Sequence, residues 1–379
     1  MKNQFTRIAE VVTTDEKAAV RELFEGIYQE EMGGVIFFCS ADYDLDKLAC
    51  EMNETFSCPV IGCTTAGEIG TRYINGGMVA VSLSSKVFRL HPYMITPLKG
   101  FDIASAQEIT DTLSSELTLS ATLDPNKMFG LLLIDGLSVL EEMITATLHN
   151  VLKGVSLIGA SAGDSLNFTE TRVYFKGEFI SDAAVFSLIE TSLDFETFKI
   201  QHFVPSEKDM VITEADPSQR IVYEIDGGPA GEEFAKIIGL DVKELTSQIF
   251  AMYPVMLQIG EDWYVRSIQK TNDDGSLTFF CAIDEGLPLI VAKGVGIVDT
   301  LKEKVKELET DFSEIELTIG FDCILRRLEI MEKTLSKNVE DELRKIKFIG
   351  FSTFGEQFNS LHVNQTLTGV TIGYHSSKV

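Results

Sequence analysis

Residues 348–366 have the sequence Phe-Ile-Gly-Phe-Ser-Thr-Phe-Gly-Glu-Gln-Phe-Asn-Ser-Leu-His-Val-Asn-Gln-Thr, in which an apolar run is followed by a dense set of polar residues. Its apolar beginning, from Ile346 to Phe351 with Lys347 between, predicts a buried strand. Two hydroxyls, a glycine and a carboxylate follow directly, and then comes an amide-rich segment with one of the five histidines. Buried polar groups are costly unless they are satisfied. Either the backbone of the fold or a ligand must therefore pair with them.

The same pattern occurs three times in the chain. Residues 61–68 (IGCTTAGE) and 349–356 (IGFSTFGE) share the form I-G-x-[ST]-T-x-G-E, and residues 158–164 (IGASAGD) are a copy that is one residue shorter. Each copy follows an amphipathic helical stretch and precedes a strand, and internal repetition of this kind indicates the architecture. We expect three superposable strand–helix–strand–turn–strand units. The predicted units are residues 35–83, 130–189 and 319–373.

The predicted elements indicate a mixed α/β fold with two domains. Apolar residues at helical spacing predict a helix over residues 11–31, whose start Asp15 favours, and a long helix over 321–345. Residues 138–141 (SVLE) have the pattern of a capping box, which predicts the start of another helix. Alternating apolar residues between turn signals over 210–290 predict an antiparallel meander.

Composition excludes several classes of function. The formal net charge of −26 argues against binding to nucleic acid and to anionic membranes, because both need clustered Lys and Arg. The six cysteines show no zinc-binding spacing and no CxxC motif, so we expect reduced structural thiols. The sequence shows neither a signal peptide nor an apolar run of transmembrane length. These features predict a cytoplasmic protein.

The ordered motifs of this chain resemble the FIST family. Residues 61–68 and 158–164, with 172–175 after them, are similar to the N-terminal FIST domain; residues 211–230, 264–268 and 349–365 are similar to the C-terminal FIST domain. FIST proteins are prokaryotic intracellular sensors, so the resemblance implies a signal-transduction protein without catalytic activity. It also implies a histidine kinase or a cyclic-di-GMP signalling protein as partner, and leaves room for a homodimer.

The resemblance divides the chain into two expected domains. Residues 1–215 would form the N-terminal domain, internally duplicated over about 30–95 and 129–190. Residues 216–379 would form the C-terminal domain and hold the ligand site. No low-complexity linker marks the boundary.

One branch of the family is similar to haem proteins that sense nitric oxide and inhibit a partner histidine kinase. Its sequences are similar to residues 355–357 and 362–366 of this chain, which implies haem as cofactor and His362 as the axial ligand of the iron. A second-shell acceptor must hold the other ring nitrogen, and the residues expected to orient the ring are Asn359, Asn364 or Gln365. The residues expected to cover the macrocycle are Phe351, Phe354 and Phe358.

A sensor of a small organic molecule is the alternative, because the family has also been proposed to bind ligands such as amino acids. Arg266 lies in an apolar strand and needs a carboxylate or an anionic ligand, so we expect it to face Glu356 or a bound anion. The residues expected at the site under either hypothesis are Arg266, Ser352, Thr353, Glu356, Asn359, His362, Asn364 and Gln365.

Other readings of the polar residues stay open. The polar turns could be structural, with hydroxyls and acids satisfying nearby backbone groups. A hydrolase would use Ser161, in the G-x-S-x-G pattern of residues 159–163, or Ser352; but a nucleophile elbow leads into a helix, whereas here a loop and a strand are expected. His202 is undecided, and Cys58 before Pro59 is a second candidate haem ligand. The histidines expected to be surface or capping residues are His91, His149 and His375.

Overall fold

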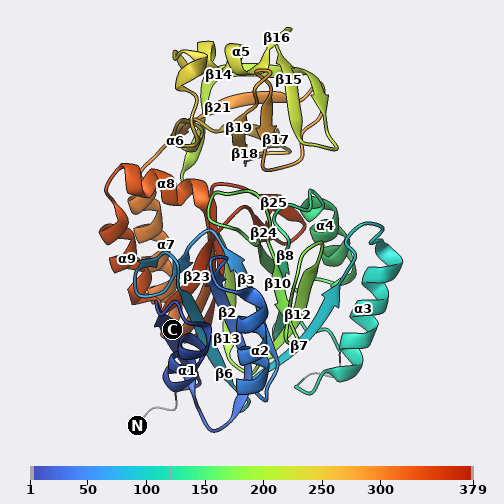
Figure 1. Cartoon of the computed structure of the whole chain (residues 1–379), viewed down its shortest axis with the longest axis vertical. Helices are drawn as coiled ribbons and strands as arrows, with labels where there is room; N and C mark the ends of the chain where they lie inside the picture. The colour runs from blue at the N-terminus through green and yellow to red at the C-terminus, as the bar shows by residue number, and fades with distance from the viewer. Residues whose placement is uncertain (1–3, 120–121, 377–379) are drawn as a thin grey trace.

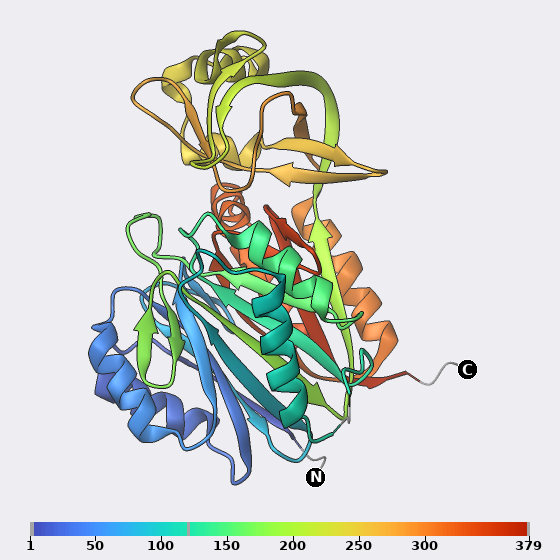
Figure 2. The same cartoon turned by 90° about the vertical axis from the view of Figure 1, so that its right-hand side faces the viewer.

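The computed structural model describes residues 4–119 and 122–376 and has a larger body with a smaller lobe at one end (Figures 1 and 2). Residues 203–294 form the lobe, which is inserted between the strand β13 (Asp194–Gln201) and the helix α7 (Ile297–Asp311). The fold is mixed α/β, as the sequence predicts. Among the described residues, no helix combines the length and the apolar character that a membrane span needs.

Within the described residues, the body contains three six-stranded sheets, with strand orders β1-β6-β2-β3-β10-β11, β7-β12-β8-β9-β24-β25 and β13-β26-β22-β23-β4-β5. The strands not yet placed are β1 (Thr6–Val11), β2 (Met32–Ser40), β3 (Val60–Thr65), β4 (Glu68–Ile69), β5 (Tyr73–Ile74), β6 (Met78–Ser84), β7 (Phe88–Ile95), β8 (Met128–Ile134), β9 (Leu157–Ser161), β10 (Val173–Phe175), β11 (Glu178–Ile180), β12 (Ala184–Thr191), β22 (Phe312–Cys323), β23 (Phe348–Thr353), β24 (Glu356–Phe358), β25 (Leu361–Val363) and β26 (Thr366–His375). The other helices of the body are α1 (Glu16–Ile27), α2 (Leu45–Thr55), α3 (Ile103–Glu116), α4 (Glu141–Val151), α8 (Ile324–Glu332) and α9 (Ser336–Lys345).

Three units with the same strand order make up the body, which confirms the predicted repeat. Each unit contains two parallel strands joined by helix. The pairs are β2 and β3, β8 and β9, and β22 and β23. The last strand of each unit, β6, β12 or β26, pairs antiparallel with the first of the two. The repeat is longer than predicted, because a further strand and helix precede each unit: β1 with α1, β7 with α3, and β13 with α7.

A short hairpin in each unit pairs with a different unit. The hairpin β4–β5 of the first unit lies on β23 of the third, β10–β11 of the second lies on β3 of the first, and β24–β25 of the third lies on β9 of the second. The exchange therefore closes a ring in which every unit completes the sheet of another.

The central core lies between the three sheets and contains residues from all of them. Phe38 of the first sheet packs on Phe351 and Phe321 of the third, with ring centroids 4.7 and 6.1 Å apart. Separate apolar clusters pack the helices on the outer faces, α1 and α2 on the first sheet, α3 and α4 on the second, and α7 to α9 on the third.

The lobe is an antiparallel sheet of eight strands in the order β18-β17-β21-β14-β15-β20-β19, with β16 paired to β15. The predicted antiparallel sheet is confirmed, but its strands do not follow one another in the chain order of a meander. Its strands are β14 (Phe203–Asp216), β15 (Ile221–Ile225), β16 (Gly228–Pro229), β17 (Val255–Ile259), β18 (Asp262–Arg266), β19 (Ile268–Thr271), β20 (Leu277–Phe279) and β21 (Pro288–Gly294). Its helices are α5 (Ala230–Ile238), the 3₁₀ turn η1 (Val242–Glu244) and α6 (Ser247–Met252).

The expected boundary at 215/216 falls within the β14–β15 hairpin, at the end of β14. Strands from both sides of it share the sheets of the body, because β23 pairs with β4 and β26 pairs with β13. The spatial division thus differs from the linear one, since the lobe interrupts the third unit.

The long helix predicted over residues 321–345 is wrong. β22 continues to Cys323, and the helical segment is divided into α8 and α9 at Thr334, which has a φ of +57°. Apolar spacing could not show either change, because the end of a buried strand and a buried helix start have similar composition.

Candidate functional site

The three polar turns meet at the centre of the body, where the second strands of the units end. Backbone hydrogen bonds link each turn to another unit: Ala66 N donates to Ser352 O (2.9 Å), Gly163 N to Thr64 O (3.0 Å) and Ser161 N to Gly355 O (2.8 Å). The structural reading of the turns is therefore confirmed for their backbone and for several side chains.

The acid that ends each turn accepts hydrogen bonds from nearby chain. Glu68 Oε2 accepts from Gly77 N (3.2 Å), and at the equivalent position Glu356 Oε2 accepts from Thr366 Oγ1 (2.7 Å). Burial raises the pKa of Glu68 to about 7 and that of Glu356 well above its usual range, while the bonds from the threonines oppose the shift. In the second unit Asp164 accepts from three backbone N–H groups of residues 168–170.

His362 lies on β25, buried, opposite Gln357 of β24. Gln357 Nε2 donates to His362 Nδ1 (3.1 Å) and to Ser161 Oγ (3.0 Å). Burial lowers the pKa of His362, against the smaller opposing effect of the carboxylates Glu142 and Glu141. The imidazole is therefore neutral at pH 7, and with Nδ1 accepting, its proton is on Nε2.

Gln357, which the sequence analysis did not single out, holds the ring of His362. The signal was the two-residue turn at 359–360, which places residue 357 opposite 362 across a hairpin. The expectation that Asn359 orients the ring is wrong. Asn359 Oδ1 accepts from Leu157 N (3.3 Å) and Asn359 N donates to Leu157 O (2.6 Å), so this residue fastens the hairpin to β9.

Buried polar atoms without a hydrogen-bond partner among the described residues gather in the segment 356–368. Native structures leave few such atoms, so a group of them indicates a place where a ligand or water can bind. They are Glu356 Oε1, Gln357 Oε1, His362 Nε2, Asn364 Oδ1 and Nδ2, Gln365 Oε1 and Thr368 Oγ1.

Gly355 brings two of these groups together. A Cβ at Gly355 would lie 2.6 Å from His362 Nε2 and 3.1 Å from Asn364 Nδ2. Gln365 lies at the start of β26, and its Nε2 donates to Ala251 O (3.1 Å) in the lobe. His362, Asn364 and Gln357 share one side of the hairpin, whereas Glu356 alternates to the other side.

The lobe and α4 supply charged groups around His362. Arg220 of the lobe, which is buried, donates from Nη2 to Glu141 Oε2 (2.6 Å) and to Glu142, and from Nη1 to Phe280 O (2.7 Å). Glu142 Oε1 also accepts from Ala282 N (2.6 Å). The site thus lies where the lobe meets the body.

The capping box predicted at residues 138–141 is wrong. α4 begins at Glu141 without a side-chain cap, and Glu141 is paired with Arg220 of the lobe. Ser138 Oγ accepts only from Leu140 N (3.3 Å). A long-range ion pair has displaced the local hydrogen bond, which a sequence pattern cannot show.

Arg266 lies half-buried on β18, and the structure does not bring it to Glu356. Its Nε has no partner among the described residues, and its charge acts on His362 and Cys281 instead. The expected pairing with Glu356 is wrong, because Glu356 is bonded to Thr366 and Arg266 makes no ion pair within the described part of the chain. Whether Arg266 holds an anion stays a prediction.

Ser352 and Thr353 are satisfied by the chain itself. Ser352 Oγ accepts from Arg327 Nη1 (3.2 Å). Thr353 Oγ1 lies 2.8 Å from Ser161 O and accepts from Gly355 N (3.0 Å). Ser161 Oγ is bonded to Gln357, and within the described residues neither serine has a hydrogen bond to a histidine that could serve as a base.

His202 is a structural residue at the crossing between body and lobe. It is fully buried, its Nε2 lies 2.7 Å from Glu329 Oε2, and its Nδ1 lies 2.8 Å from Arg326 Nη1. Val295, on the returning chain, donates its N–H to His202 O (2.7 Å). The two chain segments that connect the body to the lobe are therefore hydrogen-bonded to each other, and the segment at His202 is also bonded to α8. Arg326 Nη2 has no partner among the described residues.

The remaining candidates are accounted for by the fold. His91 is buried, with Nε2 2.8 Å from Glu190 Oε2, so its expected surface role is wrong. His149 is half-buried near the end of α4, and His375 is exposed and stacks on Phe312. Cys58 is half-buried, and burial raises the pKa of its thiol.

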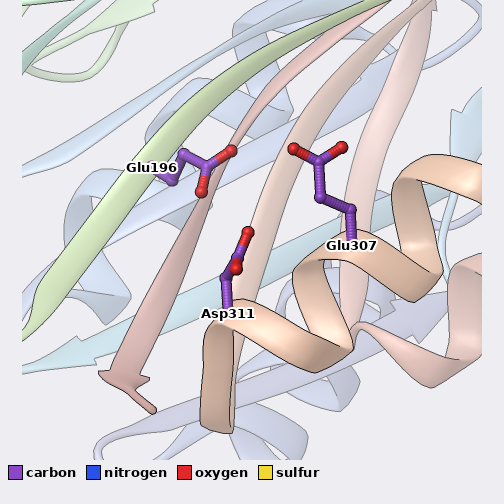
Figure 3. Close-up of side chains that lie close together, drawn as sticks. All are labelled: Glu196, Glu307 and Asp311. Atoms are coloured by element: carbon purple, nitrogen blue, oxygen red, sulfur yellow. The ribbon is translucent and has the colours of Figure 1, made fainter. Parts of the chain in front are cut away.

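An acidic cluster lies on α7 and β13, away from this site (Figure 3). Each of Glu196, Glu307 and Asp311 offers a carboxylate oxygen, and these atoms lie within 4.8 Å of one another. Lys304 bonds Glu196 (2.9 Å) and Glu307 (3.1 Å), so the charge is already partly neutralised by the chain.

Haem fits the surroundings of His362 only in part. The ring offers a nitrogen without a partner, as an axial ligand must. The phenylalanines expected to cover the macrocycle pack elsewhere. Phe351 packs on Phe38 in the central core, the partly buried Phe358 packs against the same core, and Phe354 packs on Phe168 with centroids 4.8 Å apart. What surrounds His362 is amides and charged groups, which suit a small polar molecule better than a large apolar ring.

Two family models match the chain in order. The FIST N domain matches residues 34–228, and the FIST C domain matches residues 230–359. FIST domains are sensory domains of signal transduction. An uncharacterized protein of Methanocaldococcus jannaschii is 22% identical over 232 residues, which are 57% of this chain. The match spans 44% of that relative's length.

Proposed function

Because this chain belongs to the FIST family of sensory domains, we propose that it is a sensor of a small polar organic molecule bound beside the β24–β25 hairpin. One observation carries this proposal: the buried and unpartnered polar atoms of His362, Asn364 and Gln357, which lie on one side of that hairpin. Leaving them unpaired costs about 1–3 kcal/mol for each group, which a bound molecule would recover.

The site offers both donors and acceptors. His362 Nε2–H and Asn364 Nδ2 can donate, while Asn364 Oδ1 and Gln357 Oε1 can accept. The half-buried Arg266 on the lobe adds a cation that suits a carboxylate. A molecule that carries both kinds of group, such as an amino acid, matches this set.

The lobe provides a route from ligand to output. Arg220 and Gln365 join the lobe to the body on either side of the site, so a ligand that binds one arrangement of the lobe better shifts the population toward it. We propose that a histidine kinase or a cyclic-di-GMP signalling protein recognises that arrangement.

A thermal-unfolding screen with the standard amino acids tests the proposal. A ligand at 100 times its Kd should stabilise the protein by about 2.7 kcal/mol, seen as a raised Tm. Asn364→Ala should remove the effect, whereas Asn359→Ala, a substitution in the same hairpin but outside the site, should keep it. If no small polar molecule raises the Tm, or if Asn364→Ala responds like the wild type, the proposal fails.

Haem binding with nitric-oxide sensing is the second candidate, favoured by the unpartnered Nε2 of His362. Rotation of the Gln357 amide would let Oε1 accept from Nδ1–H and leave the Nε2 lone pair for iron. Bound haem would supply an open coordination position for a diatomic gas. Haem titration of the wild type and of His362→Ala, followed by the Soret band, decides this. Equal uptake with identical spectra would place the iron ligand elsewhere.

A further inference from the structure

The hairpins of the first and third units provide an internal comparison for the ligand site. Ile69 pairs with Gly350, and Gln357 pairs with Gly159, the same glycine of the repeated motif. Across the hairpins, Tyr73 therefore corresponds to His362, and two residues further on Asn75 corresponds to Asn364. The next residues agree as well, since Gly76 and Gln365 both have a positive φ, of +73° and +51°.

In the first unit, a guanidinium lies beside Tyr73 and Asn75. Arg327 of α8 donates from Nη2 to Asn75 Oδ1 (2.7 Å) and to Ile74 O (3.0 Å), and from Nη1 to Ser352 Oγ (3.2 Å). Its Cζ lies 4.9 Å from the centroid of the Tyr73 ring. The amide oxygen of Asn75 and the carbonyl oxygen of Ile74 thus both accept hydrogen bonds from one guanidinium nitrogen.

At the third-unit position the chain supplies partners for only some of the corresponding polar atoms. Ser161, which corresponds to Ser352 in the motif, is bonded by Gln357 Nε2. The ring of His362 lies against Gly355, as the guanidinium of Arg327 lies against Gly67. Among the described residues, however, no group takes the place of Nη2, and both amide atoms of Asn364 are left without a partner although the residue is fully buried.

Within the described residues, no cation of the chain takes that place. The helix over this hairpin is α4, whose first turn carries Glu141 and Glu142, whereas the first turn of α8 carries Arg326 and Arg327. Arg220 of the lobe is held by both glutamates, and Arg266 makes no ion pair within the described part of the chain. The neutral His362 does not oppose a cation, since burial lowers its pKa.

We propose that the ligand presents a guanidinium group to Asn364, in the place that Nη2 of Arg327 has at Asn75, and that a carboxylate of the same molecule faces Arg266. The inference rests on the ligand site proposed above and names the chemistry of its ligand: a guanidino acid. The amide of Asn364 supplies the acceptor, as the amide of Asn75 does for Arg327.

Calorimetric titration with four probes tests this inference. L-arginine carries both groups, agmatine lacks the carboxylate, L-citrulline replaces the guanidinium with a neutral urea of similar shape, and L-lysine replaces it with an ammonium. We expect L-arginine to bind most tightly and L-citrulline about tenfold or more weakly than that, because a charge-assisted hydrogen bond is about twice as strong as a neutral one. Agmatine should also bind more weakly, by the loss of the contact to Arg266.

Variants of Asn364 locate the binding. Asn364 makes no hydrogen bond within the described chain, so its replacement should leave the fold intact. Asn364→Ala should weaken the binding of L-arginine by about tenfold or more, and Asn364→Asp should strengthen the binding of agmatine. Asn359→Ala should bind each probe with the affinity of the wild type. Equal affinity for L-arginine and L-citrulline, no effect of Asn364→Ala, or no binding of any cation would overturn the inference.

The two proposals can fail separately. If the amino-acid screen finds a ligand without a cationic side chain whose binding needs Asn364, the sensor proposal stands and the guanidinium inference falls. If nothing in that screen or among these probes binds, both fall.

Discussion

Glu68 and Glu356 hold equivalent places in the repeat, yet only Glu68 has both carboxylate oxygens bonded. Glu68 Oε1 accepts from Thr65 Oγ1 (2.6 Å), whereas Thr353, the residue equivalent to Thr65, turns to Ser161 O and Gly355. Glu356 Oε1 is left without a partner among the described residues. The two turns therefore differ in one hydroxyl contact. In the first turn Thr65 bonds the glutamate, whereas in the third turn Thr353 bonds elsewhere and Glu356 Oε1 can accept from a ligand.

The raised pKa of Glu68 predicts a loss of stability as the pH rises. The folded state holds this proton up to about pH 7, whereas an unfolded glutamate releases it near 4.5. The stability contributed by the protonated group is thus complete below about pH 4.5 and is lost as the pH rises through about 7, by about 3 kcal/mol. Between pH 5 and pH 8, the free energy of unfolding measured in urea should fall by about 3 kcal/mol less in Glu68→Gln than in the wild type. Equal losses would show that Glu68 is charged in the folded protein.

Gly67 is required by the close approach of Arg327. It has a φ of +124°, and a Cβ there would collide with Nη1 of the buried guanidinium. Gly76 also has a positive φ, of +73°, but a Cβ there would meet nothing within 4 Å, which makes it a matched control. Chemical denaturation should show a loss of about 1 kcal/mol for Gly76→Ala and about 3 kcal/mol or more for Gly67→Ala. Similar losses would mean that backbone strain alone explains both.

At the scale of single elements, two helices that the sequence marks with a start signal begin differently. Asp15 caps α1, because its Oδ1 accepts from Ala18 N (2.8 Å), and the expectation from the sequence is confirmed there. α4 has no side-chain cap, and its glutamates bind Arg220 of the lobe. A cap signal holds where no distant partner competes for the same side chain.

Cap substitutions should separate these two helices. Asp15→Ala should reduce the free energy of unfolding by about 1 kcal/mol, and Ser138→Ala by less than about 0.5 kcal/mol. Equilibrium urea unfolding of both variants checks the difference. A loss of about 1 kcal/mol for Ser138→Ala would show that Ser138 does cap α4.

At the scale of the whole molecule, the exchange of hairpins makes the three units dependent on one another. β13 pairs with β26, β4 pairs with β23, and β9 pairs with β24, and each of these pairings joins chain on opposite sides of residue 216. No unit can complete its sheet from its own strands.

A fragment of residues 1–215 should therefore not fold by itself. It would leave the edge of β9 and the hairpin β4–β5 without partners, and unpaired strand edges are unstable and prone to aggregation. Far-UV circular dichroism and thermal melting of this fragment, beside the full chain, test the expectation. A cooperative transition of the fragment would show that the linear division is also a folding unit.

The sequence determined the local and repeated parts of this structure. Alternation and helical spacing are properties of neighbouring residues, so the buried strands, the antiparallel strands of the lobe and the three units could be predicted. The long helix over 321–345 and the meander order of the lobe were not correct. The same reasoning singled out His362, Asn364 and Gln365, since amides and an imidazole after a buried strand need partners from somewhere.

Only the tertiary structure decided which of these groups have partners. Ser352, Thr353 and Asn359 are satisfied by Arg327, Ser161 and Leu157, which lie from 25 to about 200 residues away in the chain. The packing of α8 on β23 creates the first of these contacts, and the pairing of the third unit with β9 creates the other two; no pattern among neighbouring residues encodes them. Arg220 enters the site for the same reason, because the inserted lobe brings it to the surroundings of His362. Gln357 differs, since it lies only five residues from His362 and the hairpin register places it opposite that ring.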